Sequence, residues 1–118
     1  MTLLVWAGVA VLGGVGALMR FGVDGYVGER AASEFPWGTF VVNISGAFLL
    51  GLVAGAALHG DALLLVGTAT LGSYTTFSTW MLEAHRLGED GVLWVALANI
   101  AVSVLVGVGA AELGRLIA

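Results

Sequence analysis

The chain of 118 residues contains no cysteine and no lysine, and it has a single proline and only two histidines. Without cysteine, disulfides and thiol chemistry are excluded. A net charge of −4 without any basic run argues against nucleic acid as a partner. Charged residues make up only 10% of the chain, whereas they form about a quarter of ordinary soluble domains. The sequence is therefore not that of an ordinary soluble protein.

Apolar residues are what the chain has in excess, at 59% of the total with a mean hydropathy of +1.03. Stretches without Asp, Glu, Lys or Arg cover residues 1–19, 36–58, 62–82 and 91–111. Each is close to the roughly 20 residues with which a helix crosses a hydrocarbon layer of about 30 Å. The pattern predicts an all-α membrane protein, one domain over 1–118, with four transmembrane helices at about 2–22, 37–58, 62–84 and 91–115.

The few arginines give only a weak signal for orientation. In the predicted topology Arg115 lies on one side of the membrane, while Arg30 and Arg86 lie on the other, with Arg20 near it. The cytoplasmic side normally carries the excess of Lys and Arg. So small a difference predicts a chain that can insert both ways. A bundle this thin leaves little room for an internal site, so we expect a dimer with polar sites at its interface.

Small residues recur at helical spacing along the predicted spans. The pairs are Gly13 with Gly16, Gly51 with Gly55, and Gly107 with Ala111. In lipid, small residues three or four apart let helix backbones approach closely, because van der Waals contact replaces the hydrophobic drive to associate. These pairs therefore predict close helix packing.

Two predicted helices each carry a narrow polar stripe: Thr39, Asn43 and Gly46 in one, and Asn99, Ser103 and Gly107 in the other. Residues three or four apart share one helix face. A single buried Asn or Ser commonly does no more than bond a neighbouring helix. A third polar segment in the same membrane region favours a shared polar site instead.

The third polar segment reads LGSYTTFSTW over residues 71–80. Gly72 and Ser73 interrupt an apolar helix, and the β-branched and aromatic residues after them favour helix poorly. The pattern predicts a helix stop at Gly72 and a restart capped by Thr75 or Thr76. A helix broken in the membrane exposes backbone carbonyls that suit a small cation, and the restarted helix points its positive end toward an anion.

The groups available in these segments are amides, hydroxyls, an indole N–H and aromatic ring edges. No Ser/His/Asp set, paired carboxylates within a span or phosphate loop is present, so an enzyme is not expected. Neutral dipoles can replace the water around a small anion without trapping it as a full charge would. The inventory therefore favours conduction of an anion over catalysis.

Three motifs are similar to the signature regions of the Fluc, or CrcB, fluoride channels. They read GGVGALMR over 13–20, PWGTFVVNISGAFLLG over 36–51 and GSYTTFSTW over 72–80. The resemblance extends along all four predicted spans. It implies an antiparallel dimer of oppositely inserted copies, with two fluoride pores and a structural sodium ion at the centre of the interface.

The resemblance also implies roles for particular residues. The backbone carbonyls of Gly72 and Thr75 would bind sodium, and Arg20 would be a vestibule or structural residue. The fluoride pore would be lined by Asn43, Phe77, Ser78, Thr79, Trp80 and Ser103. The function so implied is passive export of fluoride through the plasma membrane of a prokaryote.

The sequence departs from the family pattern at four positions: Tyr74, Trp80, Asn99 and Gly107. Trp80 replaces a second phenylalanine but still offers an aromatic edge and adds an N–H donor. Altered pore residues can mark one half of a pair of different subunits, so a heterodimer stands beside the homodimer as an alternative. Two alternative functions stand beside the fluoride channel. One is a small multidrug-resistance-type transporter, although the carboxylate that such transporters have in the first helix is missing here. The other is a non-transporting membrane assembly subunit.

Overall fold

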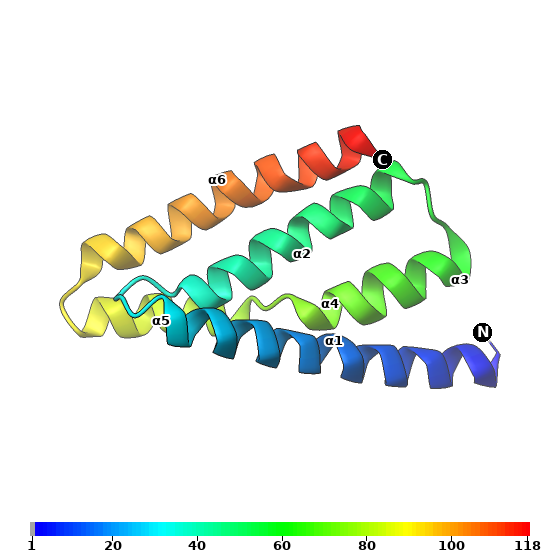
Figure 1. Ribbon diagram of the computed structural model, residues 1–118, viewed down its shortest axis with the longest axis horizontal. Coiled ribbons are helices and arrows are strands. Elements are labelled where there is room, and N and C mark those ends of the chain that lie inside the picture. Colours follow the sequence, from blue (N-terminus) through cyan, green and yellow to red (C-terminus); the bar gives the residue numbers. More distant parts are fainter. Residues whose placement is uncertain (1) are drawn as a thin grey trace.

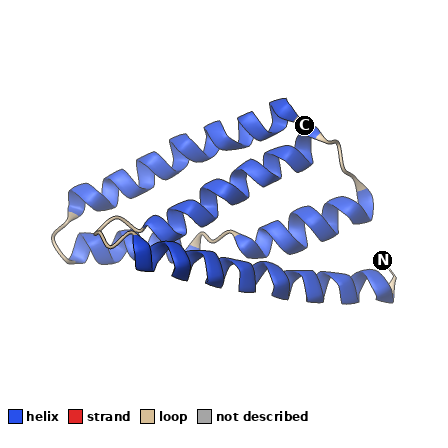
Figure 2. Cartoon of the chain, in the orientation of Figure 1, coloured by secondary structure: helices blue, strands red, loops and turns tan. Residues whose placement is uncertain are grey.

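The computed structural model describes residues 2–118, and the regular elements in this range are helices (Figure 2). The long helices are α1 (Leu3–Arg30), α2 (Trp37–Gly55) and α6 (Leu93–Ile117). Between α2 and α6 lie α3 (Gly60–Ala62), the π-helix η1 (Leu63–Leu71), α4 (Gly72–Tyr74) and α5 (Ser78–Glu89). The predicted all-α class is confirmed.

The helices lie side by side along the long axis of the molecule (Figure 1). Successive passes run in opposite directions, and both ends of the chain lie at the same end of the bundle. Helices α1, α2 and α6 are long and apolar enough to cross a membrane. The predicted span at 62–84 is not among these, because it is divided into shorter helices.

Several helix ends differ from the ends of the predicted spans; α5, for example, ends at Glu89 rather than residue 84. Helix α1 continues to Arg30, beyond the end near residue 22 that was predicted for the first span. Helix α2 ends at Gly55 rather than residue 58. Ala57 has a φ of 56°, in the left-handed region that commonly follows a helix end.

Glycines bring the backbones of α2 and α6 into direct contact. A Cβ atom added to Gly51 would overlap the carbonyl oxygen of Ala111, and one added to Gly114 would overlap that of Phe48. Gly55 meets the end of α6 in the same way. The prediction that Gly51 and Gly55 mark close helix packing is confirmed, and Gly114 adds a contact from the opposite helix.

The third pass is broken, but the break begins later than predicted. Gly72 has helical dihedral angles, φ −62° and ψ −35°, and its N–H bonds to Gly67. The helix ends at Tyr74 instead, and Thr75 is extended with a ψ of 162°. The predicted stop at Gly72 is therefore wrong: glycine tolerates a helix interior here, and the chain leaves the helix only at the β-branched Thr75.

The helix restarts at Ser78. The hydroxyl of Thr76 accepts a hydrogen bond from the N–H of Thr79 at 3.2 Å, so Thr76 supplies a capping bond as predicted, although the residue directly before the helix is Phe77. Thr75 does not cap α5, because its hydroxyl donates backwards to the carbonyl of Leu71 at 3.2 Å.

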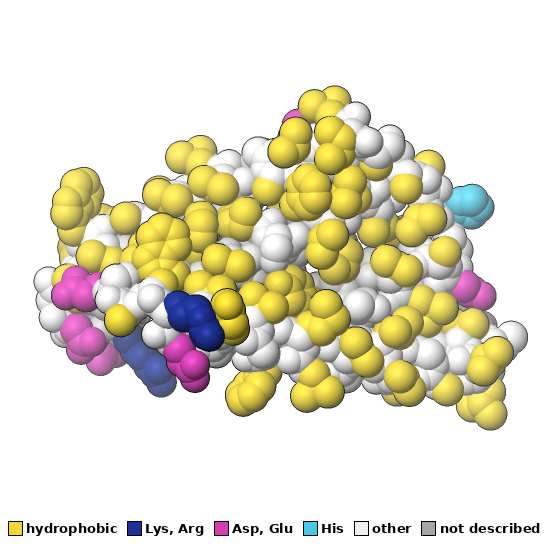
Figure 3. Space-filling model, viewed as in Figure 1, with side chains coloured by type: hydrophobic (Ala, Val, Ile, Leu, Met, Phe, Trp, Pro, Cys, Tyr) yellow, Lys and Arg dark blue, Asp and Glu magenta, His cyan; other side chains and the backbone are white. Residues whose placement is uncertain are grey.

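The surface is apolar over most of its length. Figure 3 shows hydrophobic side chains along the middle of the molecule, with most of the charged side chains in view gathered near the end where α1 stops and α5 lies. Large apolar side chains such as Leu18, Leu105 and Val108 are exposed, and an apolar surface of this kind suits contact with lipid rather than with water. The surface therefore agrees with a membrane environment.

Candidate functional site at the helix break

The side chain of Asn43 in α2 bonds to the backbone of the broken segment. Its Nδ2 donates to the carbonyl oxygen of Thr76 at 2.8 Å, and the N–H of Thr76 donates to its Oδ1 at 2.8 Å. Backbone groups released by a break in a membrane helix need protein partners, since lipid offers none. Asn43 supplies hydrogen-bond partners for both backbone groups of Thr76. One of its two amide hydrogens remains beyond these bonds.

The break removes helical donors from several carbonyl groups, among them those of Gly72 and Thr75. In a continuous α-helix each N–H bonds the carbonyl four residues earlier. Thr76 would then donate to Gly72, but it donates to Asn43 instead. Thr79 would donate to Thr75, but it donates to the side chain of Thr76 instead. The carbonyl oxygens of Gly72 and Thr75 are the two for which the resemblance to the fluoride channels implies sodium binding.

Tyr74 anchors the other side of the break to α2. Its hydroxyl lies 2.8 Å from Oγ of Ser45, which donates to the carbonyl of Val41 at 2.6 Å. The Tyr74 side chain is buried, with 5% of its surface exposed. This departure from the family pattern therefore has a structural role: it ties the end of α4 to the helix that carries Asn43.

An open groove of about 370 Å³ lies along one side of the break. It is lined by Asn43, Ile44, Ala47, Leu50, Thr75, Thr76, Phe77, Trp80, Ser103, Val104, Gly107 and Val108. The groove thus brings together five of the predicted site residues: Asn43, Thr75, Phe77, Trp80 and Ser103. The rings of Phe77 and Trp80 meet edge to face, with centroids 5.8 Å apart.

Helix α6 contributes its polar stripe to the same region. Oγ of Ser103 donates to Oδ1 of Asn99 at 3.4 Å, and Nε1 of Trp80 lies 3.5 Å from the carbonyl oxygen of Asn99. Asn99 is fully buried, and its amide nitrogen has no partner among the described residues. The sequence marked Asn99 as part of a stripe, and the structure places it between two predicted pore residues.

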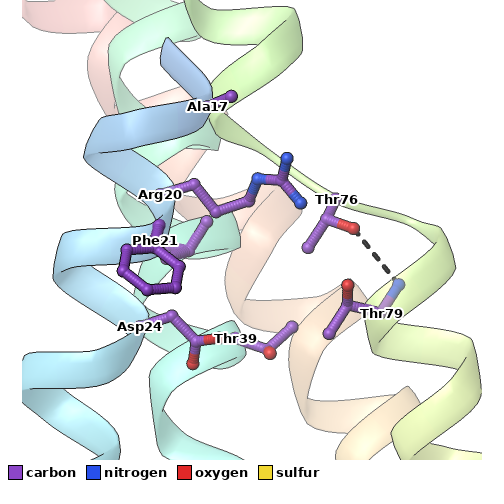
Figure 4. A pocket seen from close by; sticks show the side chains of 8 residues that line it. Ala17, Arg20, Phe21, Asp24, Thr39, Thr76 and Thr79 are labelled. Atoms are coloured by element: carbon purple, nitrogen blue, oxygen red, sulfur yellow. Dashed lines mark hydrogen bonds between the residues drawn. The ribbon is translucent and has the colours of Figure 1, made fainter. Parts of the chain in front are cut away.

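A second hollow, of about 250 Å³, lies on the α1 side of the break (Figure 4). It is lined by Ala17, Arg20, Phe21, Asp24, Thr39, Val42, Thr76 and Thr79. In Figure 4 the guanidinium of Arg20 extends toward Thr76. Nε of Arg20 and Oγ1 of Thr39 are buried without a hydrogen-bond partner in the described chain. Arg20 and Thr79, both predicted site residues, therefore share this second hollow.

Thr76 lines both hollows, and the sequence indicated it only as a helix cap. Its importance arises from Asn43, which lies 33 residues away in the chain, so no local pattern contained the signal. Ser78, in contrast, lines neither hollow, and its hydroxyl lies 3.5 Å from that of Thr76.

These features define a class of protein. Long apolar helices, one broken helix among them and neutral dipoles around the break are typical of membrane proteins that pass small ions. A sequence profile described as "CrcB-like protein, Camphor Resistance (CrcB)" matches residues 7–115. The chain belongs to the CrcB family.

Curated relatives agree with this placement. A protein of Mycolicibacterium paratuberculosis named fluoride-specific ion channel FluC 2 is 59% identical over 117 residues, which cover 99% of this chain and 96% of that relative. The FluC 2 protein of Mycobacterium bovis is 57% identical, with coverage of 100% and 94%. That of Clostridium acetobutylicum is 35% identical, with coverage of 92% and 93%. These relatives are named as ion channels and not as enzymes, in agreement with the sequence prediction.

Proposed function

We propose that the chain forms a fluoride-selective channel through which fluoride leaves the cell passively. The relatives named above as fluoride-specific ion channels match nearly the whole chain. The structural observation that carries the proposal is the backbone of Thr76, whose N–H and carbonyl both bond to Asn43 at the helix break. A groove of aromatic edges and polar groups lies beside it. Neutral donors of this kind suit an anion that must enter and also leave.

Each lining residue has a proposed role. The ring edge of Phe77 and the remaining amide hydrogen of Asn43 would meet fluoride in the groove, because the edge of an aromatic ring is electropositive. Ser103 and the Trp80 ring would line the same route. On the other side of the break, Thr79 and Arg20 would receive the ion in the second hollow. Ser78 lines neither hollow, and its contact with fluoride would require surface from a second copy.

Sodium fits the carbonyl groups at the break. Gly72 and Thr75 have carbonyl oxygens whose helical donors are bonded to side chains. Unwound backbone carbonyls of this kind bind Na⁺ in membrane transporters. Gly72 and Thr75 would hold the ion, which would supply positive charge at the break and fix the backbone there.

A second, oppositely inserted copy would complete the site. The groove is open along its length, and Phe77 is 70% exposed on a single chain. The weak arginine asymmetry allows both orientations. We propose an antiparallel homodimer in the plasma membrane of a prokaryote, consistent with bacterial relatives. A related subunit replaces the second copy in the heterodimer alternative.

The test is fluoride efflux from liposomes that contain only this purified chain, read with a fluoride electrode. We expect rapid efflux when a potassium ionophore relieves the counter-charge, and far slower release of chloride from matched vesicles. Silent liposomes that hold folded protein would contradict the homodimeric channel. Flux that appears only on adding a related subunit would support the heterodimer.

A further inference from the structure

We propose that Asn43 and Thr76 are positioning residues for a cation site, because each binds a backbone N–H at the break and so fixes the backbone that presents the carbonyl oxygens of Gly72 and Thr75. Asn43 accepts from the N–H that a continuous helix would direct to Gly72, and Thr76 accepts from the N–H that it would direct to Thr75. This inference rests on the proposed function in one respect, the binding of sodium at those carbonyls. It assigns the two side chains a task beyond lining a pore.

The hydroxyl of Thr76 is the acceptor for the N–H of Thr79. Its Oγ1 lies 3.2 Å from the amide nitrogen of Thr79, which is the first turn of α5. Valine has nearly the shape of threonine but no acceptor. Without that acceptor, the N–H of Thr79 has the carbonyl of Thr75 as its helical partner, and α5 would extend toward the break. The Thr75 carbonyl would then be less available to a cation.

The amide of Asn43 binds both backbone groups of Thr76: its oxygen accepts from the N–H and its nitrogen donates to the carbonyl, each at 2.8 Å. Aspartate keeps an oxygen that can accept from the N–H of Thr76, whereas leucine offers neither group. Asn43→Asp should therefore still hold the N–H of Thr76, and Asn43→Leu should release the backbone that presents the carbonyl of Gly72. The same aspartate would place a negative charge beside the anion route. This one variant should therefore impair fluoride conduction while the response to sodium remains.

Thr70 provides a matched control outside the site. It is half-buried like Thr76, and its hydroxyl donates to the carbonyl of Leu65 at 2.7 Å, away from the N–H groups of Thr76 and Thr79. Thr70→Val removes that hydroxyl and leaves the groups at the break in place. Thr76→Ser keeps the acceptor that Thr76→Val removes.

The experiment measures unfolding of the purified full chain in detergent by tryptophan fluorescence. Sodium chloride is titrated against N-methylglucamine chloride at constant ionic strength. For the unmodified chain we expect sodium to raise the unfolding temperature by about 5 °C, as a ligand specific for the folded state does. For Thr76→Val and Asn43→Leu we expect the sodium concentration at half-effect to rise about tenfold, the equivalent of one hydrogen bond. Thr70→Val and Thr76→Ser should titrate like the unmodified chain, and Asn43→Asp should keep a response to sodium.

The outcomes separate the two proposals. If the unmodified chain shows no response to sodium, the proposed sodium site is wrong. If it responds and Thr76→Val responds equally, the positioning role is wrong while the sodium site stands. An equal loss in Thr70→Val would also overturn the inference, since it would show a general effect of removing a hydroxyl. Thr76→Ala, which lacks the acceptor in a smaller side chain, replaces Thr76→Val if that variant does not fold.

Discussion

The contact between α2 and α6 and the break between α4 and α5 satisfy the same membrane constraint in opposite ways. Between α2 and α6, backbone meets backbone through Gly51 and Gly114, and each helix keeps its own hydrogen bonds. At the break, backbone groups lose helical partners and bond side chains such as Asn43 and Thr76. The first region is dry and close-packed, and the second is polar and hollowed.

The comparison shows a division of labour along α2. The same helix offers Gly51 to α6 and Asn43 to the break. Because lipid provides no hydrogen-bond donors, the broken segment needs a partner helix that is itself held rigidly. Close packing of α2 on α6 therefore supports the polar geometry of the break. Variants that affect one region and spare the other test this separation.

The largest effect is expected from Gly51→Leu, which attacks the close-packed region. Its Cβ would overlap the carbonyl of Ala111, so α2 and α6 must separate. Overpacking a rigid contact costs about 1–3 kcal/mol or more. We expect loss of the folded peak in size-exclusion chromatography. Gly109→Leu is the control, because nothing lies within 4 Å of a Cβ at Gly109. Equal behaviour of both variants would show that the α2–α6 contact is not the scaffold.

Phe77→Ile attacks the break and should leave the scaffold intact. Phe77 is largely exposed, so the fold loses little, but the groove loses its aromatic edge. We expect fluoride efflux to fall by about 100-fold or more, which corresponds to roughly 3 kcal/mol in the barrier. Unfolding temperature should stay near that of the unmodified chain.

Phe35→Ile is the control for that variant. Phe35 packs against Trp37 and Phe40, outside both hollows, so its replacement should leave efflux nearly unchanged. Unchanged efflux in Phe77→Ile would remove this ring from the anion route.

Asn43→Asp should reduce conduction by at least about tenfold, because it puts a negative charge beside an anion in a region of low dielectric. The aspartate can still accept from the N–H of Thr76, so part of the clamp on the break remains. Currents across planar bilayers measure the change. Normal currents in this variant would mean that Asn43 holds the backbone without lining the route.

The sequence predicted the close-packed region well and the break only in outline. The spacing of Gly51 and Gly55 predicted close packing against another helix, since small residues four apart are a local pattern with one physical meaning. The broken third pass and the Thr76 cap were also readable from composition. The position of the stop was not, because a glycine tolerates helical and non-helical dihedral angles alike.

The contacts that shape the site could not be derived from local patterns. The bond from Asn43 to Thr76 and the one from Ser45 to Tyr74 join residues 33 and 29 positions apart. No helical periodicity relates such distant residues. The second hollow escaped prediction for the same reason, since it combines Arg20 and Thr39 with Thr76.

The smallest effect is expected from Trp80→Phe, which sharpens the comparison at the edge of the polar region. Nε1 of Trp80 lies 3.5 Å from the Asn99 carbonyl, at the long limit of hydrogen bonding, so its loss removes a weak interaction. Phenylalanine keeps an aromatic edge beside Phe77. We expect fluoride efflux to change by about two- to threefold, the equivalent of less than 1 kcal/mol, with little change in unfolding temperature. A silent variant would show instead that the indole N–H is a required donor, and that the break depends on α6 as strongly as on α2.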